Sequence, residues 1–121
     1  MHELSIAHGI VDTVSTALGD TPGVVRDVSI AVGALSGVVP DALHFCFEIA
    51  TADTRLSGAT LSIEQVPVAI WCPTCAAVVE PPPPLSFRCP VCNTVSGDVR
   101  RGRELDVLSY TFDDEPALEG A

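Results

Sequence analysis

The sequence contains no lysine, and its six basic residues are all arginine. Sixteen acidic residues give the chain a formal net charge of −10 at pH 7. Nucleic-acid phosphates are normally bound by a basic surface that releases counterions, yet only Arg100, Arg101 and Arg103 lie close together in the sequence. The charge balance therefore argues against a protein that binds nucleic acid.

Other absences narrow the function further. The chain has no apolar run of about 18 residues, the length that a membrane-spanning helix needs, and no recognisable signal or transit peptide. We therefore expect a soluble, cytoplasmic protein with no membrane partner. Because no nucleophile–base pair, phosphate-binding loop or supported carboxylate pair is recognisable, we also expect that the protein is not an enzyme.

Cysteine carries the strongest signal in the sequence. Two Cys-x-x-Cys pairs, Cys72 with Cys75 and Cys89 with Cys92, are separated by 13 residues. Each pair directs two sulfurs at one point, and two facing pairs make the tetrahedral four-thiolate set of structural zinc sites. We therefore predict that these four cysteines bind one structural zinc ion.

Two other kinds of cysteine site stay open at this point. Rubredoxin-like iron also takes four thiolates, but glycine usually follows the second cysteine of each pair, where this chain has Ala76 and Asn93. A redox-active dithiol usually occurs as one pair within a βαβ pattern. The fifth cysteine, Cys46, lies in an apolar run and is predicted to be a small buried residue.

Hydrophobic periodicity predicts two helices and three strands. In chain order we expect a helix over residues 4–18, a strand near 28–32, a helix after Pro40, a strand over 61–70 and a strand over 105–112. The apolar phase changes within the 61–70 strand, which predicts a bulge at 65–67. The expected fold is of the α/β (α+β) class, a small three-stranded sheet with two helices.

The cysteine pairs predict a zinc-ribbon-like four-cysteine module inserted into this domain. We place the module at residues 71–99 and the α/β domain at 1–70 and 100–121. The module has few apolar side chains, so its folding should depend on the metal, which contributes an apparent ~10–16 kcal/mol in such sites. Residues 81–84, all proline, predict a rigid extended spacer, and the acidic tail over 113–121 is predicted to fray.

The N-terminus offers a second candidate metal site. A terminal amine, the next backbone nitrogens and an imidazole at position 2 can close fused chelate rings around a metal that prefers four nitrogens in a plane, such as Ni(II) or Cu(II). Met1, His2 and Glu3 supply these groups. Taken alone, a histidine at position 2 is weak evidence for a metal site, because it is more often a solvated terminal side chain. His8 and His44 are not included in the ligand set.

These features together resemble one known family. The opening Met1-His2-Glu3-Leu4-Ser5-Ile6, the segment Leu43-His44-Phe45-Cys46-Phe47-Glu48, the two Cys-Pro-x-Cys pairs and Gly102-Arg103-Glu104-Leu105 resemble the HypA/HybF hydrogenase nickel-incorporation proteins. The resemblance extends from residue 1 to about residue 112, in the order of the family's motifs.

The resemblance implies a nickel metallochaperone. Nickel would be bound by the Met1 amine, the backbone nitrogens of His2 and Glu3 and the His2 ring, while the four cysteines hold zinc. The implied partners are a HypB-type GTPase and the large subunit of [NiFe]-hydrogenase, and the chain would be a monomer or weak homodimer. The alternative is a zinc-ribbon adaptor that binds protein or nucleic acid and delivers no metal.

Overall fold

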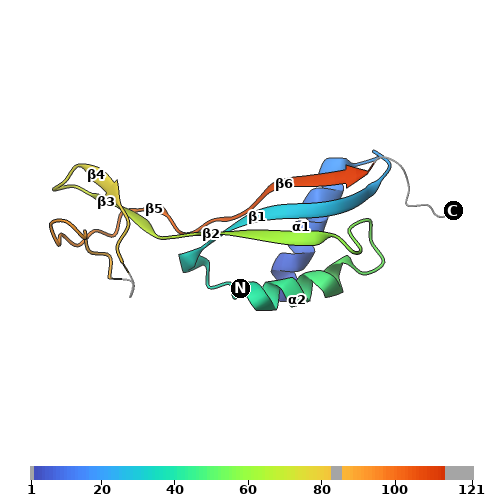
Figure 1. Cartoon of the computed structure of the whole chain (residues 1–121), viewed down its shortest axis with the longest axis horizontal. Coiled ribbons are helices and arrows are strands. Elements are labelled where there is room, and N and C mark those ends of the chain that lie inside the picture. The colour runs from blue at the N-terminus through green and yellow to red at the C-terminus, as the bar shows by residue number, and fades with distance from the viewer. Residues whose placement is uncertain (1, 83–85, 114–121) are drawn as a thin grey trace. The chain divides into compact units, whose positions relative to one another are not determined.

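The computed structural model of the chain describes residues 2–82 and 86–113. They form two compact units (Figure 1). The first unit contains the described residues of Met1–Ala31, Gly37–Glu64 and Asp106–Ala121, and the second contains those of Val32–Ser36 and Gln65–Leu105. The assignment of 71–99 as a zinc-binding domain and of the remainder as a nickel-binding domain stays a prediction. Residues 83 and 84 of the proline spacer and 114–121 of the tail lie outside the described residues.

Two helices pack against each other in the first unit. Helix α1 spans Glu3–Leu18 and buries Ile6, Ala7, Ile10, Val11, Val14 and Leu18 along one face. Helix α2 spans Pro40–Thr51, with proline in its first turn, where the missing N–H costs no helical hydrogen bond. Its buried residues include Leu43, Phe47 and Ala50, as the spacing predicted. Both predicted helices are therefore confirmed.

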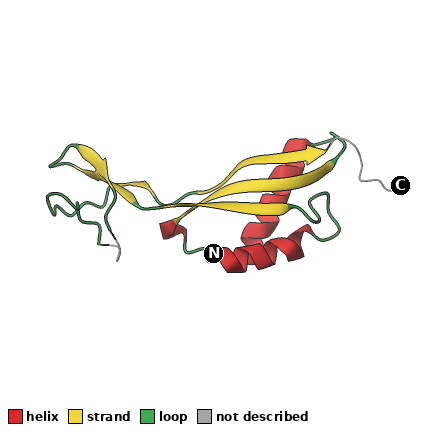
Figure 2. Ribbon diagram, viewed as in Figure 1, coloured by secondary structure: helices red, strands yellow, loops and turns green. Residues whose placement is uncertain are grey.

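The larger sheet has three strands in the order β2-β1-β6 (Figure 2). Strand β1 spans Val24–Gly33, β2 spans Thr60–Val66 and β6 spans Leu105–Asp113. The central strand is buried at Val25, Val28 and Ile30, whereas the edge strand β6 has no fully buried residue. The last strand thus joins the first sheet, and the predicted three-stranded sheet with two helices is confirmed.

A second, smaller sheet belongs to the second unit. Its order is β4-β3-β5, with β3 at Ala69–Cys72, β4 at Ala77–Val79 and β5 at Val99–Arg101. Both pairings are antiparallel. A short 3-10 helix at Ala34–Ser36 completes this unit's elements. The central strand β3 ends at Cys72, the first cysteine of the cluster. Cys72 is therefore held in the most buried strand of this sheet.

The predicted bulge at 65–67 is wrong. The segment predicted as one strand over 61–70 forms two separate strands instead. Strand β2 ends at Val66 and β3 begins at Ala69, and the two strands belong to different sheets. Pro67 has no N–H to donate to a ladder. The change of apolar phase therefore marks a change of sheet rather than an irregularity within one strand.

The fifth cysteine also differs from its prediction. Cys46 lies on α2 and is only partly buried.

Within 2–82 and 86–113, no helix combines the length and the apolar character needed to cross a bilayer.

Candidate metal centres

Two similar turns bring the four cysteines together. In the first, Cys72 ends β3 and pairs with Ala77 of β4 across the turn. In the second, the amide of Cys89 donates to the carbonyl of Thr94 at 2.9 Å. The residue after each pair, Ala76 or Asn93, has a positive φ, of 53° and 66° respectively. Such a conformation disfavours alanine, so the first turn carries backbone strain that the site geometry requires.

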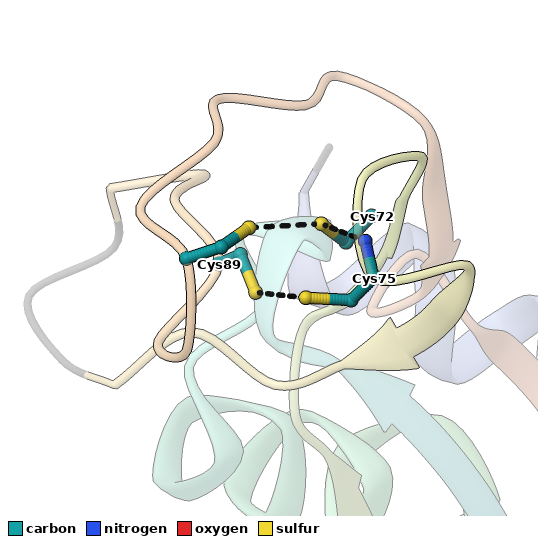
Figure 3. A group of neighbouring side chains, drawn as sticks. Cys72, Cys75 and Cys89 are labelled. Carbon is teal, nitrogen blue, oxygen red and sulfur yellow. Dashed lines mark hydrogen bonds between the residues drawn. The ribbon is translucent and has the colours of Figure 1, made fainter.

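The sulfur positions fit a four-coordinate metal. All four Sγ atoms lie within 4.8 Å of one another. The Sγ atoms of Cys72 and Cys92 are 3.4 Å apart. Those of Cys75 and Cys89 are 3.8 Å apart (Figure 3). A tetrahedron with metal–sulfur bonds of about 2.3 Å has sulfur–sulfur edges of about 3.8 Å. The four cysteines predicted as zinc ligands are therefore brought together at separations close to those of a four-thiolate zinc site.

Hydrogen bonds orient three of the sulfurs. The Cys75 amide donates to Cys72 Sγ at 3.4 Å, and the Val91 amide donates to Cys89 Sγ at 3.4 Å. The Thr94 hydroxyl lies 3.1 Å from Cys92 Sγ. Such second-layer donors fix the ligands and stabilise their thiolate form.

Contacts within the cluster shift the pKa values of Cys75 and Cys92 in opposite directions. Hydrogen bonding to the thiol of Cys92, and then to that of Cys89, raises the pKa of Cys75 to about 12. The hydroxyl of Thr94 is the main cause that lowers the pKa of Cys92 to about 6. Thiolates this close repel one another, so they can all ionise together only around a cation. The donor set is thus one for a thiophilic divalent ion, and zinc fits it.

The second candidate site lies at the start of α1. His2 is the N-cap of this helix, and its Nδ1 accepts a hydrogen bond from the Leu4 amide at 3.3 Å. Glu3 is the first helical residue, and its carboxylate accepts from the Val39 amide, just before α2, at 3.1 Å. That hydrogen bond is the main reason why the pKa of Glu3 lies below its ordinary value. The predicted ligand Met1 lies outside the described residues.

Sequence reasoning missed both of these contacts. Histidine is not among the preferred N-cap residues, so nothing marked His2 as a cap. The contact between Glu3 and Val39 joins residues 36 positions apart and depends on how the two helices pack. His8 and His44 are exposed on their helices.

The fold and the cysteine cluster define a class of small α+β proteins built around a four-thiolate metal centre. The family described as hydrogenase/urease nickel incorporation, metallochaperone, HypA matches residues 1–112. The chain belongs to this family, as the resemblance of its motifs predicted.

Individual relatives agree with this assignment. The chain is 47% identical over 110 residues to the hydrogenase maturation factor HypA of Chloroflexus aggregans, covering 90% of this chain and 96% of the relative. It is 50% identical, with the same coverage, to the HypA of Chloroflexus aurantiacus. The solution structure of the Ni metallochaperone HypA from Helicobacter pylori matches with a TM-score of 0.65 at 19% identity, covering 93% of this chain and 97% of that one, which shows a shared fold. The chain is thus a nickel metallochaperone of hydrogenase maturation, and the adaptor alternative is not favoured.

Proposed function

We propose that this chain carries Ni(II) on its first three residues and delivers it to the large subunit of [NiFe]-hydrogenase. It acts in the cytoplasm as a carrier rather than a catalyst, together with a HypB-type GTPase. Zinc bound by the four cysteines stabilises the fold and supplies no redox chemistry. The observation that carries the proposal is the position of His2 and Glu3 at the very start of α1.

The start of a helix suits a chelate made of backbone nitrogens. The first intrahelical bond in α1 runs from the Ile6 amide to the His2 carbonyl at 3.1 Å. The amides of His2 and Glu3 precede it and have no carbonyl partner within the helix; the Glu3 amide interacts with the carboxylate of its own side chain. They can therefore lose their protons to a metal without breaking a helical hydrogen bond. The Met1 amine and the His2 ring complete four nitrogens in a plane, which Ni(II) prefers.

The same geometry makes the nickel site a weak one. Nδ1 is the ring nitrogen closest to the backbone, and it is already hydrogen-bonded to the Leu4 amide. Nickel binding through this nitrogen must therefore break the N-cap of α1, which in helices generally contributes about 1 kcal/mol. The positive end of the helix dipole opposes a cation by a further ~0.3–1 kcal/mol. A site that holds its ion loosely suits a protein that must release it.

The arginines of the second unit argue against nucleic-acid binding. Arg100 forms an ion pair with Asp98 at 2.9 Å and lies 5.0 Å above the Trp71 ring. Arg101 lies 3.5 Å from Glu80. Two of the three clustered arginines are therefore paired with carboxylates rather than presented to phosphates.

Nickel titration of the untagged protein tests the proposal. We expect one Ni(II) per chain, with the visible absorption of planar coordination, besides the zinc. An N-terminal extension of two residues should abolish this binding because it turns the Met1 amine into an amide, and His2→Ala should abolish it because it removes the imidazole. His8→Ala is the matched control, since it removes an exposed histidine from the same helix and should leave the affinity unchanged. Affinity should also fall in acid, because protons compete with the metal for the nitrogen ligands.

The extended chain and the His2→Ala variant decide whether the N-terminal ligand set is correct. Equal affinity of the extended and native chains would remove the terminal amine from the ligand set. Equal affinity of His2→Ala would remove the ring. Either result would disprove the N-terminal nickel site, while the family assignment would stand.

A further inference from the structure

The four cysteines of the cluster differ in their exposure. Cys72 and Cys89 are buried, with 0% and 2% of their surface exposed. Cys92 is partly buried, and Cys75 is exposed. Cys75 and Cys92, one from each turn, are therefore more accessible to a reagent in solution than Cys72 and Cys89.

The two accessible sulfurs differ in their hydrogen bonds. Cys92 Sγ lies 3.1 Å from the Thr94 hydroxyl. For Cys75 Sγ, within residues 2–82 and 86–113, the interactions found are with the other sulfurs of the cluster, that of Cys89 at 3.8 Å among them. When all four sulfurs are metal-bound thiolates, a hydrogen bond from a hydroxyl draws electron density from the sulfur and makes it less basic and less nucleophilic. Cys92 is therefore protected by Thr94 in a way that Cys75 is not.

Two features hold the Thr94 hydroxyl against the sulfur. The Thr94 carbonyl accepts from the Cys89 amide at 2.9 Å, which fixes its backbone in the second turn. Its hydroxyl also lies 3.1 Å from the Thr74 hydroxyl in the first turn. Because Thr74 can donate its proton to Thr94, the Thr94 proton is left to point at Cys92. The two threonines thus form a bridge between the turns that ends on one sulfur.

We propose that Cys75 is a covalent modification site at which soft electrophiles react with the zinc cluster, and that Thr94 directs the reaction there by protecting Cys92. With an alkyl halide such as iodoacetamide, the Cys75 thiolate forms a sulfur–carbon bond, the carbon–iodine bond breaks and iodide leaves. The product is a thioether, a weaker ligand than a thiolate, so modification loosens the hold of the cluster on its metal. The proposal concerns the zinc centre and does not depend on the nickel site.

The test is timed alkylation of the zinc-loaded full chain. Cys46→Ser is used as the background, because this partly buried cysteine lies outside the cluster and would also react. Iodoacetamide is added, and peptide mass spectrometry follows each cysteine while zinc is measured in parallel. We expect Cys75 to react first, about tenfold faster than Cys92, and zinc release to follow its modification.

Variants at the threonines separate protection from simple exposure. Thr94→Val keeps the shape but removes the hydroxyl, and should raise the rate at Cys92 by about tenfold, close to that of Cys75. Thr94→Ser restores the hydroxyl and should restore the slow rate. The Thr74 hydroxyl contacts the Thr94 hydroxyl rather than Cys92. Thr74→Val should therefore raise the rate at Cys92 by less than Thr94→Val does.

Two results would overturn the proposal. One is a wild-type order in which Cys92, Cys72 or Cys89 reacts as fast as Cys75. The other is an unchanged Cys92 rate in a Thr94→Val protein that still holds one zinc. If Thr94→Val does not retain zinc, the comparison of Cys75 with Cys92 in the wild type and in Thr94→Ser decides, and equal rates reject the assignment.

Discussion

Removing zinc should unfold the cysteine turns and leave α1 and α2 intact. The apolar side chains around the cluster are poorly buried: Val78, Val91 and Val95 are 40%, 80% and 59% exposed. Three residue pairs join β4 to β3. The second turn is closed by one isolated bridge, between Arg88 and Val95, and by a few backbone hydrogen bonds such as that from the Ser96 amide to the Phe87 carbonyl. A structural zinc contributes an apparent ~10–16 kcal/mol, as much as the whole stability of an ordinary domain at about 5–15 kcal/mol. Nothing of comparable size in this segment can replace it.

Amide hydrogen exchange before and after treatment with a zinc chelator measures this effect. Protection of the amides over 71–99 should be lost, while the buried helical amides of α1 and α2 keep theirs. Cys72→Ser should reproduce the loss without a chelator, and Cys46→Ser, a cysteine outside the cluster, should not. Protection that persists over 71–99 in a protein shown to contain no zinc would refute the reasoning, since packing would then hold the turns.

Two further predictions concern stability in solution. A Cβ added at Gly33 would lie closer than 3.0 Å to the backbone of Gly102, whereas one at Gly9, within α1, would meet nothing within 4 Å. Gly33→Ala should therefore lower the free energy of unfolding, and Gly9→Ala should raise it by about 0.5–1 kcal/mol in urea unfolding; a loss from Gly9→Ala would contradict this. Because the pKa of Glu3 lies below its ordinary value of 4.5, its hydrogen bond with Val39 stabilises the fold above that pH and is lost as the pH falls through the lowered pKa. Glu3→Gln should then be less stable than the wild type at about pH 7, and the difference should shrink at about pH 3, so a gap that does not change with pH would refute the assignment.

Local patterns predicted the elements of the first unit well. The helices were found because buried residues such as Val14 and Leu43 recur at helical spacing, which depends only on neighbours in the chain. The cysteine cluster was found for a similar reason, because each Cys-x-x-Cys turn is local and two such turns suit one metal.

Contacts between distant residues could not be predicted in this way. The phase change before Ile70 was visible in the sequence, but a bulge and a change of sheet produce the same pattern, and only the strand order distinguishes them. The partial exposure of Cys46 depends on how α2 packs.

The sequence by itself determined the two helices and the two Cys-x-x-Cys turns, and it predicted the zinc and nickel ligands, because each depends on residues a few positions apart. The tertiary structure decided that His2 caps α1, that Glu3 is hydrogen-bonded to Val39, and that Thr94 lies against one sulfur while Cys75 stays exposed. These properties arise from hydrogen bonds and burial, which depend on the final positions of atoms that spacing alone does not specify.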